Sequence, residues 1–357
     1  MEPSLLGFDT WFAEQYQKTS KQDFHPARIC AVDKDNFLII SEHGEMQAQV
    51  TGRLRFETES NIDYPVVGDW VLVGYYNDCT LAIIHEILPR KTLLKRKAAG
   101  KKIDFQLIGA NIDTACIMQS LDADFNISRL ERYMVAILEA GITPAILLSK
   151  SDLISSDQCG QKIVEVKKRY PGCKIIAFSN LSLDGMNDLS NIFLPAKTYC
   201  IIGSSGVGKT TLLNKLLGTE TFSTKGIRKH EHGGKHTTTR RQLIPLHNGA
   251  LYIDTPGMRE LGLISADSGI QKAFPDIELL AEKCRFPDCT HAHEPGCSIQ
   301  EALKSGDLPL KRFNSYVKLR KESEYHKRSY VEKRKKDKKF GKFIKSVMKE
   351  KKKKWLT

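Results

Sequence analysis

Apolar and polar positions divide the chain into three stretches with different periodicity. Residues 20 to about 95 hold five short apolar runs separated by polar or Gly/Pro turns, a spacing typical of strands. From residue 108, compact apolar runs alternate with helical spacing, which predicts a largely parallel sheet with helices on both faces. After residue 265 the pattern is helical. The strand runs are 27–33, 37–41, 46–52, 69–76 and 81–88, then 113–119, 143–149, 173–179, 198–203 and 251–257, with a helix over 128–141.

Three domains follow from this division. We expect an N-terminal segment and small barrel with a basic linker over 1–107, an α/β domain over 108–265, and a helical domain with a basic tail over 266–357. Five short strands without a helix-length pattern suggest a barrel of the kind that binds nucleic acid. A barrel that only packs on its neighbour is the alternative. The basic linker, 89–102, also offers cations to phosphate.

The strongest chemical signal lies between the apolar strand 198–202 and a helical run that starts near residue 211. It matches G-x-x-x-x-G-K-[ST] in the strand–loop–helix context that this P-loop pattern requires. Backbone N–H groups of such a loop surround the phosphates, its lysine reaches the β- and γ-phosphates, and its hydroxyl holds Mg²⁺. Lys209 and Thr210 are therefore catalytic candidates. The predicted phosphate-binding residues are Gly203, Ser204, Ser205, Gly206, Val207, Gly208, Lys209 and Thr210.

Two further segments fit the switches that sense the γ-phosphate. Asp254 closes an apolar run at the start of D-T-P-G, where its carboxylate can hold Mg²⁺ through water and the amide of Gly257 can contact the phosphate. Alone, D-T-P-G is a common turn; its place about 45 residues after the P-loop favours a switch. The polar stretch 219–240 fits a first switch. There Thr238 is the candidate Mg²⁺ ligand, and His236 the candidate for positioning water, with a purely structural role as the alternative.

A base-selecting motif follows the strand 143–149. The carboxylate of Asp152 can accept hydrogen bonds from guanine N1–H and N2–H₂, which adenine does not offer, and the stem of Lys150 can cover the base. The loop after the next strand, with Ser179 and Asn180, would contact the guanine oxygen through a backbone N–H. Alone, S-K-S-D is weak, and a P-loop ATPase with an incidental match is the alternative. The motif consists of Ser149, Lys150, Ser151 and Asp152.

The order of these motifs is rotated relative to most GTPases. Base motif and base loop precede the P-loop, and the switches follow it. The same sheet can form if the chain ends are moved, so we predict a circularly permuted GTPase domain. Met258 stands where many GTPases have a water-orienting Gln, so intrinsic hydrolysis should be slow and a partner should supply what is missing.

A Cys/His cluster interrupts the helical stretch. Three thiolates and an imidazole within fourteen residues suit tetrahedral Zn²⁺, and all four positions would be filled, which indicates a structural site. His293 is a less favoured alternative ligand. The predicted ligands are Cys284, Cys289, His291 and Cys297.

The basic excess is confined to the C-terminal tail. The segment from Lys311 to Lys354 carries 20 Lys or Arg and five acids, and the remainder has 35 basic and 37 acidic residues. A basic tail on a nearly neutral body favours RNA contact, with a solvated tail as the alternative. No apolar run reaches the roughly 18–20 residues of a bilayer span, and the N-terminus does not match a secretory signal. We therefore expect a cytoplasmic protein without a membrane partner.

With these motifs in place, the chain resembles the bacterial RsgA family, the ribosome small-subunit-dependent GTPases A. The resemblance covers nearly all 357 residues and rests on P-V-V-G-D-W-V, S-K-S-D, G-S-S-G-V-G-K-T-T-L-L-N, K-H-T-T-T-R, D-T-P-G-M-R-E and the zinc motif. It implies an OB-fold, a permuted GTPase domain and a zinc domain. Lys150, Asp152, the loop 203–211 with Thr211, and the zinc ligands carry over. Ser149 departs from the family's usual Asn or Thr, which predicts a weaker tie between base motif and P-loop.

The resemblance also implies a function. We expect hydrolysis of GTP to GDP, with Mg²⁺ and one structural Zn²⁺, stimulated by the small ribosomal subunit during its late maturation. The expected partners are that subunit and its rRNA, and the expected state is a monomer. An RNA-binding assembly scaffold in which nucleotide is mainly structural, and a GTPase acting on another RNA, are the alternatives.

Overall fold

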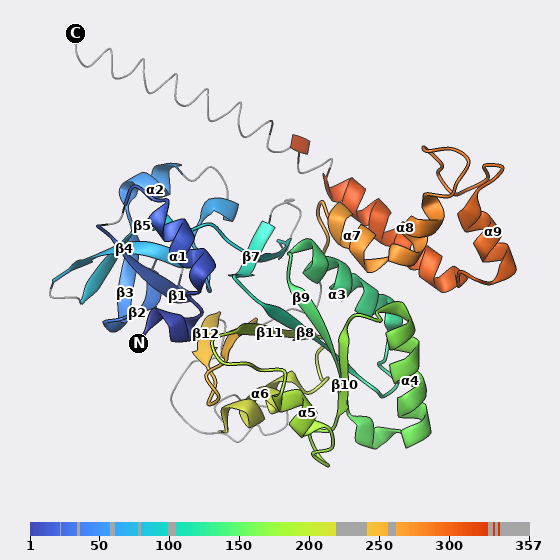
Figure 1. The fold of residues 1–357 in the computed structure, drawn as a ribbon, viewed down its shortest axis with the longest axis horizontal. Helices are drawn as coiled ribbons and strands as arrows, with labels where there is room; N and C mark the ends of the chain where they lie inside the picture. Colours follow the sequence, from blue (N-terminus) through green and yellow to red (C-terminus); the bar gives the residue numbers. More distant parts are fainter. Residues whose placement is uncertain are drawn as a thin grey trace, which may run out of the picture.

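The fold was examined in a computed structural model. It describes residues 1–21, 23–33, 36–57, 61–77, 80–98, 105–218, 241–255, 262–327, 331–332 and 335. His236, Thr238, Gly257 and Met258, together with most of the Lys-rich tail, lie outside the described residues. Figure 1 shows the three parts expected from the sequence: a barrel in blue, an α/β unit in green and yellow, and a helical unit in orange.

The five N-terminal strands close into a barrel, as predicted. Their order is β1-β2-β3-β5-β4, and β4 pairs back onto β1. The β3–β5 pair is parallel and the others are antiparallel, which gives the OB-fold. Alternate side chains such as Ile29, Phe37 and Val71 fill the interior. The elements are β1 (His25–Asp33), β2 (Asn36–Ser41), β3 (Gly44–Val50), α2 (Gly52–Glu57), η2 (Asn61–Asp63), β4 (Trp70–Tyr76) and β5 (Leu81–Ile87).

A short helical segment that the sequence did not predict covers one side of the barrel. It consists of η1 (Pro3–Leu6) and α1 (Thr10–Gln17). Asp9 caps α1 by accepting a hydrogen bond from the backbone N–H of Phe12 at 3.3 Å. The rings of Phe8 and Phe12 lie 4.7 and 6.0 Å from that of the buried Trp70. Aromatic burial therefore holds this segment in place.

The basic linker is partly a β-ribbon, with β6 (Leu93–Lys97) antiparallel to β7 (Phe105–Ala110). The boundary predicted after residue 107 therefore falls inside a strand. One linker cation is structural, because Arg90 donates two hydrogen bonds of 2.7 Å to the fully buried carboxylate of Asp69. Arg90 is consequently not available to phosphate.

The central unit is a mostly parallel sheet in the order β10-β9-β8-β11-β13-β12. All five strands predicted from the apolar runs are present, and the antiparallel β12 was missed. The elements are β8 (Thr114–Ser120), α3 (Ile127–Glu139), β9 (Thr143–Ser149), η3 (Ser151–Leu153), α4 (Ser156–Arg169), β10 (Lys174–Phe178), α5 (Met186–Ser190), β11 (Thr198–Gly203), α6 (Lys209–Leu217), β12 (Gln242–Pro245) and β13 (Leu251–Asp254).

Both faces of this sheet are covered, which explains its continuous apolar runs. On β8, Cys116 and Met118 belong to the core shared with α5 and α6, whereas Ala115 and Ile117 belong to the core shared with α3 and α4. Each strand therefore needs apolar residues at successive positions.

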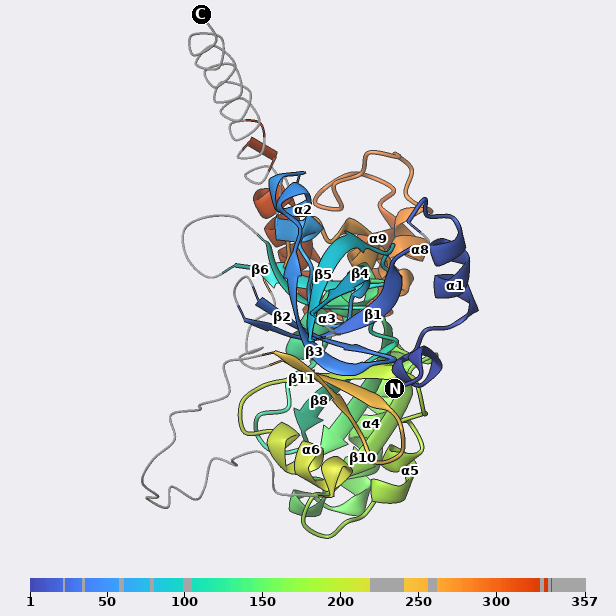
Figure 2. The same cartoon turned by 90° about the vertical axis from the view of Figure 1, so that its left-hand side faces the viewer.

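The barrel and the central unit share one sheet of eleven strands. Strand β1 pairs antiparallel with β12 through Ala31 and Gln242, and β12 pairs with β13. In Figures 1 and 2 the gold β12 lies between the barrel and the central sheet. The barrel is thus continuous with the central sheet by main-chain pairing.

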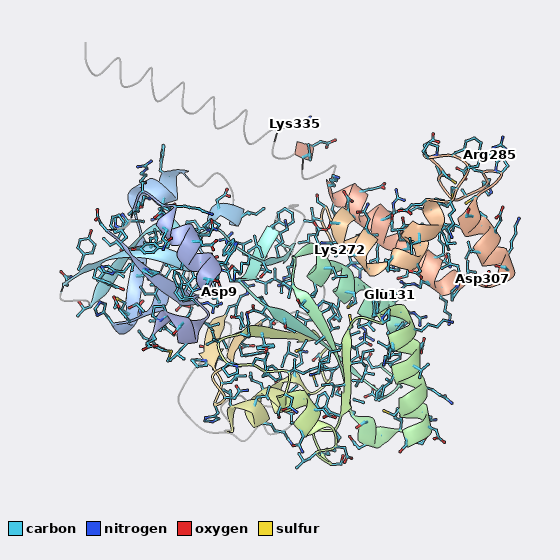
Figure 3. All side chains as sticks on the ribbon, viewed as in Figure 1. Asp9, Glu131, Lys272, Arg285, Asp307 and Lys335 are labelled. Atoms are coloured by element: carbon cyan, nitrogen blue, oxygen red, sulfur yellow. The ribbon has the colours of Figure 1, made fainter. Side chains whose placement is uncertain are left out.

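Two C-terminal helices pack on α3: α7 (Asp267–Ala273) and a helix over 310–327, whose Arg312 pairs with Glu131. α8 (Pro275–Ala281) packs on α7, and α9 (Ser298–Ser305) packs on α8. One apolar core runs from Trp70 in the barrel through Leu130 on α3 to Phe274 and Leu319. The side chains along this junction are shown in Figure 3, where Glu131 lies between α3 and the C-terminal helices. Among the described residues, no helix is long and apolar enough to cross a bilayer.

Candidate functional site

The predicted nucleotide-binding segments converge on one edge of the central sheet. The base motif follows β9, the base loop follows β10, the P-loop follows β11, and Asp254 ends β13. These strands are parallel, so their carboxyl ends meet at the same edge. The strand order reverses between β8 and β11, and ligands of open α/β sheets bind at such a point.

The P-loop conformation requires two of its glycines. A Cβ on Gly203 would lie 2.2 Å from the carbonyl oxygen of Met118, and Gly208 has φ of 98° at the start of α6. Val207 is buried and anchors the loop, whereas Ser205 and Gly206 are exposed at its crest. Thr210 and Thr211 lie in the first turn of α6, next to Lys209.

Two cations already contact the P-loop. The ammonium of Lys209 donates to the carbonyl oxygens of Gly203 and Ser204, at 2.8 and 2.5 Å. Arg129, from α3, donates to the hydroxyl oxygen of Ser204 and pairs with Asp124 at 3.0 Å. No sequence pattern pointed to Arg129, since an arginine in the first turn of a helix is usually solvated.

Ser149 ties the base motif to the P-loop. Its side chain is fully buried, and its hydroxyl lies 2.8 Å from the carbonyl oxygen of Val207 and 3.3 Å from that of Gln119. The departure from the family's Asn or Thr predicted a weaker tie. The structure shows that the hydroxyl makes the contact with the P-loop.

Lys150 is held by an acid that the sequence analysis missed. Its ammonium lies 2.8 Å from Asp122 Oδ2, and the backbone of Lys150 is left-handed with φ of 59°. Asp122 also accepts hydrogen bonds from the Ser120 hydroxyl and the Asp124 N–H, at 2.8 and 2.9 Å. These contacts, that of Lys150 foremost, lower the pKa of Asp122 to about 2. The sequence signal for Asp122 was its position: it follows the end of β8 by two residues, at the sheet edge where the other motifs lie.

The base loop is ordered around a buried hydroxyl. Ser179 donates to Asp152 Oδ1, and its oxygen accepts the N–H groups of Leu181 and Ser182 at 2.9 and 3.1 Å. Asp152 is exposed, and Ser151 precedes it in η3. Ser179 therefore aligns the carboxylate that was predicted to read guanine.

Asn180 connects the base loop to the phosphate side. Its side-chain amide donates to the carbonyl oxygen of Gly208 at 3.3 Å, and its own carbonyl accepts from Lys215 at 2.6 Å. Base loop, P-loop and α6 are thus joined through a single residue.

Asp254 is a partly buried carboxylate suited to a cation. Burial raises its pKa to about 6. Within the described residues no Lys or Arg forms an ion pair with it, and Gln242 lies opposite it on β12. A buried oxygen ligand beside the P-loop fits Mg²⁺, a hard cation that prefers carboxylates. The next residue, Thr255, donates to the carbonyl oxygen of Ile201 on the strand that leads to the P-loop, at 3.4 Å.

The four predicted zinc ligands come together in one cluster. All four ligand atoms lie within 4.8 Å of one another. Cys284 Sγ and Cys297 Sγ are 3.9 Å apart and lie 3.6 and 3.7 Å from His291 Nδ1. Zinc bonds of about 2.3 Å to sulfur and 2.0–2.1 Å to nitrogen give tetrahedral edges of about 3.8 and 3.6 Å. The cluster, completed by Cys289, therefore fits Zn²⁺, while His293 is exposed and outside it.

Sequence comparisons agree with this geometry. The family model described as RsgA GTPase matches residues 87–264. A protein of Opitutus terrae named small ribosomal subunit biogenesis GTPase RsgA is 39% identical over 334 residues, covering 91% of this chain and 90% of that protein. A protein of Vibrio parahaemolyticus named small ribosomal subunit biogenesis GTPase RsgA 2 is 38% identical, covering 98% and 93%.

Solved structures support the fold. YjeQ from Thermotoga maritima matches with a TM-score of 0.61 and 23% identity, over 83% of this chain and 96% of that one. YloQ, described as a circularly permuted GTPase, matches with a TM-score of 0.61 and 24% identity, over 85% and 96%. The predicted permutation is confirmed. The chain belongs to the RsgA GTPase family and is a GTP-hydrolysing enzyme.

Proposed function

We propose that this chain hydrolyses GTP during maturation of the small ribosomal subunit, and that the subunit stimulates the reaction. The observation that carries the nucleotide part is the tie between base motif and P-loop through Ser149 and Val207. It sets the distance between the groups that read the base and those that bind phosphate. The names of the relatives, over nine-tenths of both chains, support the partner.

Guanine recognition is assigned to Asp152, Lys150 and the base loop. Asp152 accepts from guanine N1–H and N2–H₂ while Ser179 holds its other side. Asp122 fixes the ammonium of Lys150, so that the methylene stem is available to cover the base. The backbone N–H of Asn180 faces the guanine oxygen.

Phosphate binding is assigned to the loop 203–211 and its lysine. The N–H groups of the loop and the N-terminus of α6 favour negative charge there. Lys209 exchanges its contacts with loop carbonyls for the β- and γ-phosphates. Thr210 and Asp254 would hold Mg²⁺, which neutralises charge on the phosphates. Candidate roles for Thr238, His236 and Gly257 remain predictions.

The C-terminal cluster would hold one Zn²⁺ through three thiolates and His291 Nδ1. With four protein ligands it leaves no open position and acts structurally. The described segment between Cys284 and Cys297 has few elements of its own, so the metal would supply its fold.

The remaining assignments concern the partner. The barrel domain, 1–107, and the basic tail within 266–357 are proposed to contact rRNA on either side of the GTPase domain, 108–265. The tail holds all of the excess positive charge. We propose a cytoplasmic monomer.

Turnover measurements test this proposal. GTP and ATP hydrolysis should be measured with and without purified small subunits at several salt concentrations. Strong, salt-sensitive stimulation of GTP turnover by small subunits alone is expected. Equal stimulation by large subunits or bulk RNA would favour another RNA target, and its absence would favour a scaffold. Asp152→Asn should shift preference from guanine toward xanthine nucleotides; an unchanged preference would contradict the base assignment.

A further inference from the structure

We propose that Asn180 is a positioning residue for guanine, acting by fastening the base loop to the P-loop. The inference rests on the proposed placement of guanine against the backbone N–H of this residue. The side-chain amide donates to Gly208 O at 3.3 Å, and Lys215 holds the Asn180 carbonyl at 2.6 Å. The side chain of Asn180 is therefore held by the P-loop, and its carbonyl by the helix that follows the P-loop.

The fit around Asn180 is close. A Cβ on Gly208 would lie 2.8 Å from Asn180 Nδ2, so the amide packs directly against the P-loop backbone. Ser149 binds the preceding carbonyl, that of Val207, at 2.8 Å. Two successive P-loop carbonyls thus receive one donor from each base-reading segment. Because Ser149 is short and fully buried, Asn180 supplies the second tie, on the side of the base loop.

The side-chain oxygen of Asn180 separates this positioning role from simple stabilisation of the fold. Asn180 Oδ1 is buried, and no group among the described residues donates a hydrogen bond to it. A buried acceptor without a partner disfavours the folded state. Stability of the free protein therefore does not explain the asparagine, and an alanine would avoid the cost. The asparagine is therefore explained by its amide N–H donor, which bonds to Gly208 O.

The fixed loop lowers the ordering cost of binding. The N–H of Asn180 is already aimed when guanine arrives, because its side chain and carbonyl are both held. Loss of one net hydrogen bond corresponds to roughly 2- to 12-fold in Kd. We therefore expect Asn180→Ala to weaken GDP and GTP binding by this factor while the melting temperature of the nucleotide-free protein stays equal or rises.

The test compares how much each variant weakens the binding of two nucleotides that differ at C6 of the base. Kd values are measured by calorimetry for full-length wild type, Asn180→Ala and Asn180→Asp, with GDP and with 2-aminopurine riboside diphosphate, which lacks the 6-oxygen and with it the N1–H. Loss of the N1–H bond to Asp152 affects wild type and variants alike, so it cancels when the penalties are compared. Asn180→Asp keeps the size but sets a carboxylate oxygen against Gly208 O, so its loss should be larger. Asn187→Ala, exposed on α5, is the matched control and should bind as wild type does.

The expected result is a penalty with GDP that largely disappears with the analogue lacking the 6-oxygen. Equal penalties with both nucleotides would show a general loosening of the site and overturn the positioning role. Wild-type affinity in both variants would also overturn it. Failure of the wild type to bind GDP would instead refute the proposed nucleotide site itself. If Asn180→Ala does not fold, the stability argument is wrong, and Asn180→Asp still reports on the tie.

Discussion

A buried ion pair joins the GTPase domain to the C-terminal helices, and its removal gives a sharp stability prediction. Arg312 Nη1 lies 2.9 Å from Glu131 Oε1 on α3, and the two side chains are 3% and 1% exposed. Arg312 also donates to Asp276 at 2.6 Å and to Ala273 O at 3.1 Å, and its guanidinium lies over Phe274. Replacement of Arg312 by methionine keeps much of the packing and removes the charge.

The size of the effect follows from what happens to Glu131. Burial raises its pKa even with Arg312 present. Without Arg312, the carboxylate either stays charged in the core or takes up a proton. A carboxyl with the ordinary pKa of 4.5 in the unfolded chain costs about 3 kcal/mol to keep protonated in the folded protein at pH 7. At pH 5 the same cost is below about 1 kcal/mol. That cost caps the part of the loss that comes from Glu131. The hydrogen bonds lost to Asp276 and Ala273 O add to it, which agrees with the roughly 3–5 kcal/mol seen when buried pairs are broken.

Urea unfolding at pH 7 and pH 5 measures this difference. Arg312→Met should lose about 3 kcal/mol at pH 7 and clearly less at pH 5. Among the described residues, Glu131 then keeps only the more distant Arg169, at 3.7 Å, as a cation, and its carboxyl is protonated more easily as pH falls. Arg312→Met combined with Glu131→Gln should recover most of the loss at pH 7. Arg320→Met, half-exposed on the same helix, is the control and should change stability by less than about 1 kcal/mol. A loss that is equal at both pH values would refute the reasoning.

Three further predictions concern the site. Cys297→Ser should abolish stoichiometric zinc after dialysis, measured by atomic emission, whereas Cys173→Ser should keep it; equal zinc content would contradict the ligand assignment. Asp254→Asn should stabilise the nucleotide-free protein by up to about 3 kcal/mol above pH 6 and by almost nothing near pH 4. The reason is that the pKa of Asp254 in the folded protein, about 6, exceeds the ordinary value of 3.8, so the folded state is penalised once the carboxyl ionises. A gain in the free energy of unfolding that does not grow with pH would refute this. Ser149→Ala should cost about 1 kcal/mol of stability by leaving Val207 O without its hydroxyl donor; an unchanged urea midpoint would show that the tie is dispensable.

The sequence predicted most of the fold because its apolar runs are well separated. Each of the five runs after residue 108 became a parallel strand, and their motif order sufficed to predict the permutation. The missed elements have weak local signals. Strand β12 has four residues, two of them polar or proline. The segment that contains α1 is held by Phe8 and Phe12, whose rings pack against Trp70, a residue far along the sequence. Tertiary contacts, not periodicity, specify these elements.

Site residues were predictable where a motif states the chemistry. The P-loop, S-K-S-D and the zinc ligands are local patterns, and the structure brings the members of each together. Asp122 and Arg129 were missed because their roles depend on where the ends of β8 and α3 lie relative to Lys150 and Ser204. For Asp122 the one available signal was its place two residues beyond β8, and no spacing along the chain pointed to Arg129.

The sequence patterns divide the barrel from the central unit, whereas the structure joins them at two places. A row of paired residues runs from Ala31 on β1 through Gln242 on β12 to Asp254 on β13. At a second place, the buried Arg28 of the barrel donates to Thr198 Oγ1, the first residue of the strand leading to the P-loop, at 2.8 Å.

These two joints attach the barrel to β11, which leads to the P-loop, and to β12, the partner of the strand that ends at Asp254. A rigid rotation of the barrel must break the Arg28–Thr198 contact and the β1–β12 pair, or move β11 and β12 with it. Buried hydrogen bonds from a guanidinium stabilise the folded state more than those between neutral groups. Movement of β11 and β12 together with the barrel is therefore favoured over breaking these contacts. A load on the barrel is therefore transmitted to the strand that ends at the P-loop and to the hairpin that ends at Asp254.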